Sequence, residues 1–190
     1  MKAMLLTLTL LSTLFASPQN CEVEIDTSKK SLIKDKRVKK AIITLKSTLQ
    51  KKLKKAIKDK GIINAAKFCN ANALSITQDI NDDLGKKVSI KRISAKPRNP
   101  ENQADQSEEE VLNTFLKTHS KEMVKRKLDN KTTRYYQPMY INKPICLKCH
   151  GDIKKTSAMG SFLAEHYPDD KATGYKMGDF RGAMVIDVIR

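Results

Sequence analysis

The chain has 190 residues, which is enough for one domain with a hydrophobic core. Hydrophobic residues make up 39% of the chain and charged residues 31%, a balance typical of globular proteins. The formal net charge of +16 favours an anionic partner, which can be a nucleic acid, an anionic membrane surface or an acidic protein. The location of the chain has to decide among these three.

Residues 1–16 have the pattern of a secretory signal peptide. Lys2 supplies a positive charge, Met4 to Phe15 is an apolar run too short to cross a bilayer, and Ala16 ends an acceptable cleavage site. We therefore expect the mature chain to begin near Ser17, to reside in a bacterial periplasm and to keep no stable membrane anchor. A periplasmic location excludes nucleic acid as a partner.

The first predicted helix covers Ser31 to Lys60, within a basic amphipathic region that we place at residues 17–60. Its apolar residues recur at spacings mostly of three and four, and they are Ile33, Val38, Ile42, Leu45, Leu49, Leu53 and Ile57. Lysines cover its other faces, and Gly61 suits the position after the C-terminus of a helix. Such a helix can bind anionic lipid or a target groove. Because a charged outer face is the ordinary state of a surface helix, we expect the apolar stripe to pack on the domain.

A second helix is predicted from Ile62 to about Leu84, at the start of the cofactor-binding domain that we place at residues 61–190. Gly85 closes this helix. The two helices form either an antiparallel hairpin joined at Gly61 or one bent helix. Cys69 lies in the middle of the apolar face of the second helix.

Strands separated by loops follow. Residues 87–95 predict a strand by their alternating polarity, which Lys91 and Arg92 interrupt. Further strands are predicted at residues 132–141 and 182–189, the last of them central in its sheet because its apolar run is nearly unbroken.

One more helix is predicted between the first two strands. Ser107 and Glu110 have the spacing of a capping box, and the helix that they begin continues to His119. Two helices followed by strands, loops and another helix indicate an α+β domain with an antiparallel sheet.

The residues Cys146-Leu147-Lys148-Cys149-His150 form the pattern that attaches a c-type haem. In this pattern the two thiols add to vinyl groups of the macrocycle, and the histidine becomes an axial ligand of the iron. The alternatives are a redox-active dithiol and half of a zinc site. The dithiol would leave His150 without a role, and the chain has no second Cys-x-x-Cys or histidine pair to complete a zinc site. We therefore predict one covalent haem c, held by Cys146 and Cys149 with His150 on the iron.

The residues alone leave the second axial ligand open. The candidates are Cys69, His119, His166, Met139, Met159, Met177 and Met184. Methionine is the ligand that raises the potential in cytochromes c, although methionines are also ordinary core residues. Histidines in positions like those of His119 and His166 are more often surface residues than iron ligands. Cys69 can equally be a small buried residue, or it can pair with Cys21 in an oxidising compartment.

Four segments of the chain together resemble a known family. They are Phe68-Cys69-Asn70, Lys96 to Asn102, Cys146 to Gly151, and Tyr167 to Gly182. On these segments the chain is similar to the single-haem, c-type sensor family with a PAS-like domain. Its members occur alone or as the periplasmic input module of bacterial histidine kinases, chemoreceptors and cyclases. The resemblance implies a PAS-like antiparallel sheet preceded by long helices, with a covalent haem between sheet and helix, and it implies that Cys69 is the axial ligand opposite His150.

Ligation by His150 and Cys69 suggests a function. A thiolate donates charge to the iron and favours the ferric state, so the potential should be low. Loss of the thiol on reduction would admit NO, CO or O₂, and we therefore expect a redox or gas sensor that acts on a signalling or redox protein. The alternative is a periplasmic electron carrier whose positive charge guides docking to an acidic partner. A haem enzyme is not expected, because no histidine or arginine is convincingly paired for acid–base work at an open site.

Arg98 is expected to hold a haem propionate, since a guanidinium fork suits a carboxylate.

Overall fold

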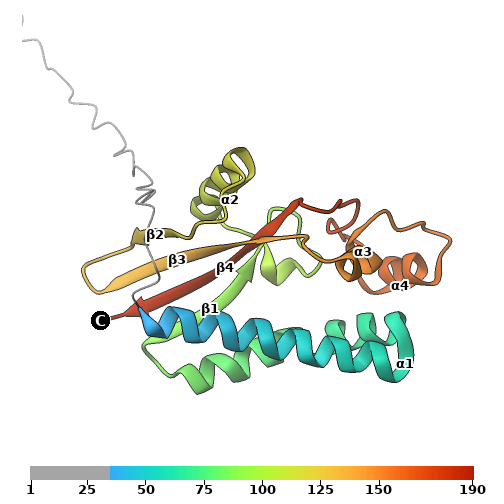
Figure 1. Ribbon diagram of the computed structural model, residues 1–190, viewed down its shortest axis with the longest axis horizontal. Coiled ribbons are helices and arrows are strands. Elements are labelled where there is room, and N and C mark those ends of the chain that lie inside the picture. Colours follow the sequence, from blue (N-terminus) through green and yellow to red (C-terminus); the bar gives the residue numbers. More distant parts are fainter. Residues whose placement is uncertain (1–34) are drawn as a thin grey trace, which may run out of the picture.

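The computed structural model describes residues 35–190 (Figure 1). The predicted signal peptide and Cys21 lie outside the described residues. The elements are α1 (Lys36–Leu84), β1 (Val88–Ile93), the 3-10 helix η1 (Pro100–Asn102), α2 (Gln106–Thr118), β2 (Val124–Lys127), β3 (Thr132–Tyr140), α3 (Pro144–His150), α4 (Ala158–His166) and β4 (Phe180–Ile189).

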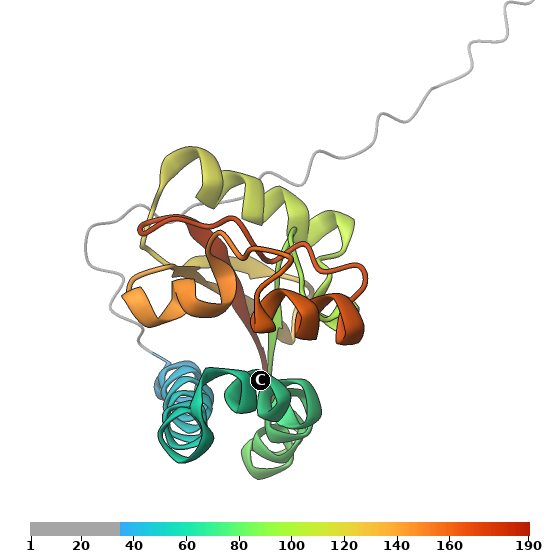
Figure 2. The ribbon, with the colours of Figure 1, turned by 90° about the vertical axis from the view of Figure 1, so that its right-hand side faces the viewer.

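The helix α1 is an antiparallel hairpin with two limbs (Figures 1 and 2). The helical backbone is interrupted at Lys60 and at Gly61, whose φ of 78° is a conformation that glycine adopts without strain. The prediction of two helices joined at Gly61 is confirmed. The first limb begins at Lys36, because the side chain of Asp35 caps it by accepting a hydrogen bond from the Arg37 backbone N–H. The predicted start at Ser31 lies outside the described residues.

The strands form one antiparallel sheet in the order β1-β4-β3-β2. The predicted central position of the last strand is confirmed, because β4 pairs with β1 on one side and β3 on the other. The prediction of an α+β domain with an antiparallel sheet is also confirmed. Its finer description as PAS-like stays a prediction.

The hairpin covers one face of the sheet, and α2 covers the other (Figure 2). On the hairpin side, Val38, Ala41 and Leu45 are fully buried in one core with Ile90 of β1 and Ile186 of β4. The apolar stripe of the basic helix thus packs on the domain as expected. Residues on both sides of position 60 contribute to the same core.

On the opposite face, α2 buries Val111, Leu112 and Phe115 against the sheet. Its N-cap is Asp105, which forms a capping box with Glu108, and not the predicted pair Ser107 and Glu110. The helix ends at Thr118, and His119 follows as its C-cap in a left-handed conformation with a φ of 51°.

The chain between β3 and β4 carries α3 and α4, which lie beyond one end of the sheet (Figure 1). Neither α4 nor the short edge strand β2 was predicted from the sequence. None of the helices within residues 35–190 is long and apolar enough to cross a membrane.

Candidate haem-binding site

The helix α3 presents three of the predicted site residues from one short turn. Pro144 occupies its first turn, where a missing N–H costs nothing, and Gly151 ends it. A Cβ at Gly151 would lie 2.7 Å from the carbonyl oxygen of Leu147, so only glycine fits there. This short helix brings Cys146, Cys149 and His150 to the same cavity.

The segment from Asp170 to Tyr175 holds the C-terminal end of α3 through hydrogen bonds. Backbone N–H groups of Gly174 and Tyr175 donate to the carbonyl oxygens of Gly151 and His150 at 2.8 and 2.9 Å. His150 Nδ1 lies 2.8 Å from the carbonyl oxygen of Ala172. Because a carbonyl oxygen only accepts, Nδ1 carries the proton in this contact. The lone pair is therefore on Nε2, the arrangement that metal-binding histidines commonly have.

Burial keeps His150 neutral. Loss of solvent is the main cause that lowers the pKa of this imidazole to about 3, and the charges of Arg181 and Arg98 lower it further. A neutral imidazole with a free Nε2 is ready to bind a metal ion at neutral pH without releasing a proton.

The second limb of α1 supplies the wall that holds Cys69. Ala65 and Ala73 lie one turn before and after Cys69, and Ala66 also lines the cavity. Three alanines leave space beside the thiol that larger side chains would fill. Burial raises the pKa of the Cys69 thiol, while the charges of Arg92 and Arg98 lower it.

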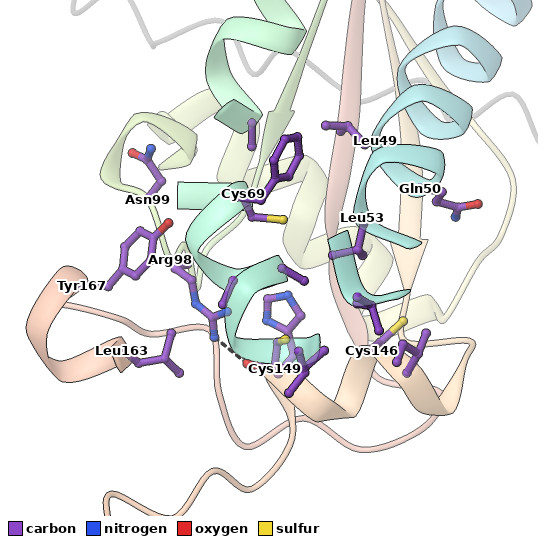
Figure 3. A pocket seen from close by; sticks show the side chains of 18 of the residues that line it. Leu49, Gln50, Leu53, Cys69, Arg98, Asn99, Cys146, Cys149, Leu163 and Tyr167 are labelled. Carbon is purple, nitrogen blue, oxygen red and sulfur yellow. Dashed lines mark hydrogen bonds between the residues drawn. The ribbon is translucent and has the colours of Figure 1, made fainter. Parts of the chain in front are cut away.

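These two walls enclose one cavity of about 360 Å³ (Figure 3). The residues brought together are Cys69, Arg98, Cys146, Cys149 and His150, all of which the sequence predicted as site residues. Apolar side chains of both hairpin limbs, α3 and α4 complete the lining, and they are Leu49, Leu53, Ile57, Ile62, Phe68, Leu74, Ile145, Phe162 and Leu163. The volume and the apolar lining are typical of a cofactor site.

Arg98 ties three segments together at the edge of the cavity. Its Nη2 donates to the Cys149 carbonyl oxygen at 2.6 Å (Figure 3). Its Nε donates to Asp170 Oδ2 at 3.0 Å, and Nη2 also donates to the Ala172 carbonyl oxygen at 3.4 Å. Asp170 Oδ1 in turn accepts from the Ala172 N–H at 2.8 Å. Arg98 thus positions the carbonyl that orients His150. The expected contact with a propionate stays a prediction.

Sequence reasoning missed two other arginines of the cavity, Arg92 and Arg181. A signal for Arg92 was present, because it interrupts the alternation of β1 and shares the buried face of that strand with Val88 and Ile90. Arg181 had no comparable signal, since it lies at the start of β4 beside Gly182, whose φ is 145°.

A comparison with family models decides the family of the chain. Residues 24–188 match the model of the Tll0287-like family, named Tll0287. The chain belongs to the Tll0287-like family. The resemblance seen in the sequence is thereby confirmed as membership of a haem-protein family of this sensor-like type.

One solved structure supports the same fold for this member of the Tll0287-like family. The crystal structure of the cyanobacterial haem protein Tll0287 matches with a TM-score of 0.63 and 22% sequence identity. The match covers 81% of this chain and 93% of that chain. No curated protein matches the chain.

The structure separates the candidates for the second axial ligand in this Tll0287-like chain. Among them, Cys69 is the one that lines the cavity. Met159 and Met184 are core residues, and Met139 packs against the same core as Met184. The others lie elsewhere on the surface: His119, His166 and Met177 are exposed.

The residues present fit a haem. Among residues 35–190, Cys69, Cys146 and Cys149 form no disulfide with one another, which leaves their sulfurs available for bonds to a cofactor. Within residues 35–190, no three His, Cys, Asp or Glu side chains form a group that could hold a bare metal ion. Arg92, which lines the cavity, also has a buried Nε with no hydrogen-bond partner among the described residues. A cofactor with an apolar body and acidic groups would suit both the apolar lining and the arginines in it.

Proposed function

We propose that this Tll0287-like protein is a periplasmic, non-enzymatic haem c protein that senses redox state or a diatomic gas. One observation carries the proposal: Cys69, Cys146, Cys149 and His150, from two separate parts of the chain, line one apolar cavity. Membership of a haem-protein family supports the choice of cofactor. When bound, the haem supplies a one-electron redox couple and an iron that can take an exogenous ligand.

The chain's own residues have separate tasks in this proposal. The thiols of Cys146 and Cys149 each add across one vinyl group, so that sulfur bonds to one carbon and the thiol hydrogen goes to the other. His150 would hold the iron through Nε2, because its Nδ1 is used in the contact with Ala172. Cys69 would be the second residue to hold the iron, from the wall of the cavity that α1 and its alanines form.

Mass spectrometry of the protein purified from a periplasmic expression host tests the attachment. Because neither thiol addition releases any atoms, we expect a mass equal to the mature chain plus one whole haem. The haem should stay attached to the protein during acid–acetone extraction. Cys146→Ala and Cys149→Ala should each leave a haem with one remaining vinyl group. Cys69→Ala is the matched control and should keep both bonds. Complete extraction of haem from the wild-type protein would overturn the proposal.

The sensor role depends on Cys69. The apolar cavity solvates an anionic sulfur poorly, so the Cys69 thiolate is stabilised chiefly by the iron charge and the nearby arginines. It should therefore leave more readily when the iron is reduced, and a gas could then occupy its place.

Carbon monoxide added to the reduced protein tests this step by absorption spectroscopy. We expect CO to bind the reduced wild type, and Cys69→Ala to bind it at least as readily. A reduced protein that keeps Cys69 on the iron and takes up no CO would contradict the sensor and favour an electron carrier.

One observation favours that second candidate. The first limb of α1 exposes ten lysines, which are Lys36, Lys39, Lys40, Lys46, Lys51, Lys52, Lys54, Lys55, Lys58 and Lys60. The only acidic residue in that limb is Asp59. Such a surface could guide docking to an acidic redox partner. Electron transfer to such a partner that slows as ionic strength rises, with unchanged haem ligation, would support the carrier.

A further inference from the structure

Two arginines of the cavity differ from the other arginines in the body of the fold. Arg37, Arg98, Arg126 and Arg134 each form an ion pair with a carboxylate. Among the described residues, neither Arg92 nor Arg181 has an ion-pair partner; both line the cavity. These two arginines without an ion-pair partner among the described residues therefore lie where a cofactor would bind.

Arg92 has unused hydrogen-bonding capacity. Its Nη2 reaches the Ala73 carbonyl oxygen only at 3.5 Å, and its Nε is buried with no partner among the described residues. A buried donor without an acceptor is costly, and more so in a charged group. This geometry is explained if an acceptor that belongs to a ligand completes the site.

Arg181 is held in place from one side of its guanidinium. Its Nη1 donates to Ser94 Oγ at 2.7 Å and to the Lys96 carbonyl oxygen at 3.0 Å, and the group lies 5.4 Å from the Tyr175 ring centroid. These contacts are all with neutral groups. They orient the cation and leave its charge without a counterion.

Burial and repulsion by a neighbouring arginine act on both groups. Loss of solvent is the main cause that lowers the pKa of Arg92 and of Arg181; the Arg181 charge adds to the effect on Arg92, and the Arg98 charge adds to the effect on Arg181. Arg98 itself is paired with Asp170. An anionic ligand would relieve the repulsion.

We propose that Arg92 and Arg181 form a carboxylate cradle that takes the propionate groups of a porphyrin. This inference deepens the proposed haem site and assigns to these two arginines the contact that the sequence had suggested for Arg98. A guanidinium can bind a carboxylate through two parallel N–H···O bonds, and neither arginine uses all of its N–H groups in contacts with the described residues. The apolar lining would take the ring itself.

Metal-free protoporphyrin IX tests the cradle without attachment or iron ligation. The full chain, prepared without attached haem, is titrated with this diacid and with its dimethyl ester, and binding is followed by porphyrin fluorescence. We expect the diacid to bind about tenfold tighter than the ester, as a charge-assisted hydrogen bond would give. Equal affinities for the two in the wild type would overturn the proposal, even if haem attachment were demonstrated. Conversely, a clear preference for the diacid would support the cradle if no covalent haem were found.

Variants locate the contact. Arg92→Gln combined with Arg181→Gln should bring the diacid-to-ester preference close to one. Arg126→Gln, the same change at an arginine outside the cavity, should keep the wild-type preference. Arg92→Lys keeps the charge without the fork and should retain an intermediate preference, which is measurable even if the double variant does not fold. A preference that survives in a folded double variant would contradict the cradle.

Discussion

Asp105 begins α2 through a reciprocal pair of hydrogen bonds. Its Oδ1 accepts from the Glu108 backbone N–H at 2.8 Å, and Glu108 Oε2 accepts from the Asp105 backbone N–H at 3.2 Å. We expect Asp105→Ala to lower the free energy of unfolding by about 1 kcal/mol, the usual cost of losing an N-cap. Chemical denaturation measures the change. Ser107→Ala removes only the hydrogen bond that Ser107 Oγ donates to Asp105 Oδ1 at 2.9 Å and should have a smaller effect, and an equal loss from both variants would contradict this assignment of the cap.

The same residues show what a local sequence pattern can and cannot predict about where a helix begins. Asp105 with Glu108 and Ser107 with Glu110 have identical spacing, so the sequence could not choose between them. The choice depends on burial, because Glu108 is fully buried and also contacts Lys91 and Arg134, whereas Glu110 is exposed. The attachment motif was predictable because its residues are adjacent in the chain. Arg181 was not, since its position in the cavity depends on how β4 leaves the sheet.

At the level of helices and strands, replacing either of two glycines should destabilise the protein, for a different physical reason in each case. Gly61 has a φ of 78° in the hairpin turn, with open space where a Cβ would be. Gly182 has a φ of 145°, and a Cβ there would collide with the Ile93 carbonyl oxygen of the neighbouring strand. We expect Gly61→Ala to cost about 1–2 kcal/mol, from backbone strain alone.

Gly182→Ala should cost clearly more than Gly61→Ala, because the strand β1 must also move away. Thermal and denaturant unfolding of the two variants compare them directly. Equal destabilisation would mean that the close contact between β1 and β4 does not matter. Because Arg181 precedes Gly182, the larger change should also reduce the preference for diacid porphyrin.

Elements with a strong periodic pattern were predictable, and those without one were not. The hairpin and β4 have long apolar repeats. The strand β2 is short, and only Val124 in it is buried, so three basic residues at the sheet edge hid it. The helix α4 contains Gly160, a poor helix former, at a point where a Cβ would collide with the Lys154 carbonyl oxygen. Close packing thus required a residue that weakened the helical signal.

At the scale of the whole molecule, the site exists only while the hairpin stays docked on the sheet. Cys69 belongs to the hairpin, whereas Cys146, Cys149 and His150 belong to α3 at the end of the sheet. Leu45 is fully buried between the hairpin and the sheet. The cavity is therefore assembled by long-range packing, which explains why the motif alone could not identify its second wall.

Leu45→Ala should test this coupling. We expect it to lower the free energy of unfolding by about 3 kcal/mol, as for other buried leucines. In the haem-loaded protein it should also increase the fraction of iron that has lost Cys69, which the absorption spectrum would report. Ile43→Ala changes a side chain on the same limb that is 53% exposed and should alter stability by about 0.5 kcal/mol or less. A strongly destabilised Leu45→Ala protein with wild-type ligation would show that hairpin docking does not control the site.

The central claim is that one cavity holds a haem between His150 and Cys69. Electron paramagnetic resonance of the oxidised, haem-loaded protein tests it most directly. We expect a thiolate-type low-spin signal in the wild type, its retention in His166→Gln and its loss in Cys69→Ala. A thiolate-type signal that survives in Cys69→Ala would contradict it.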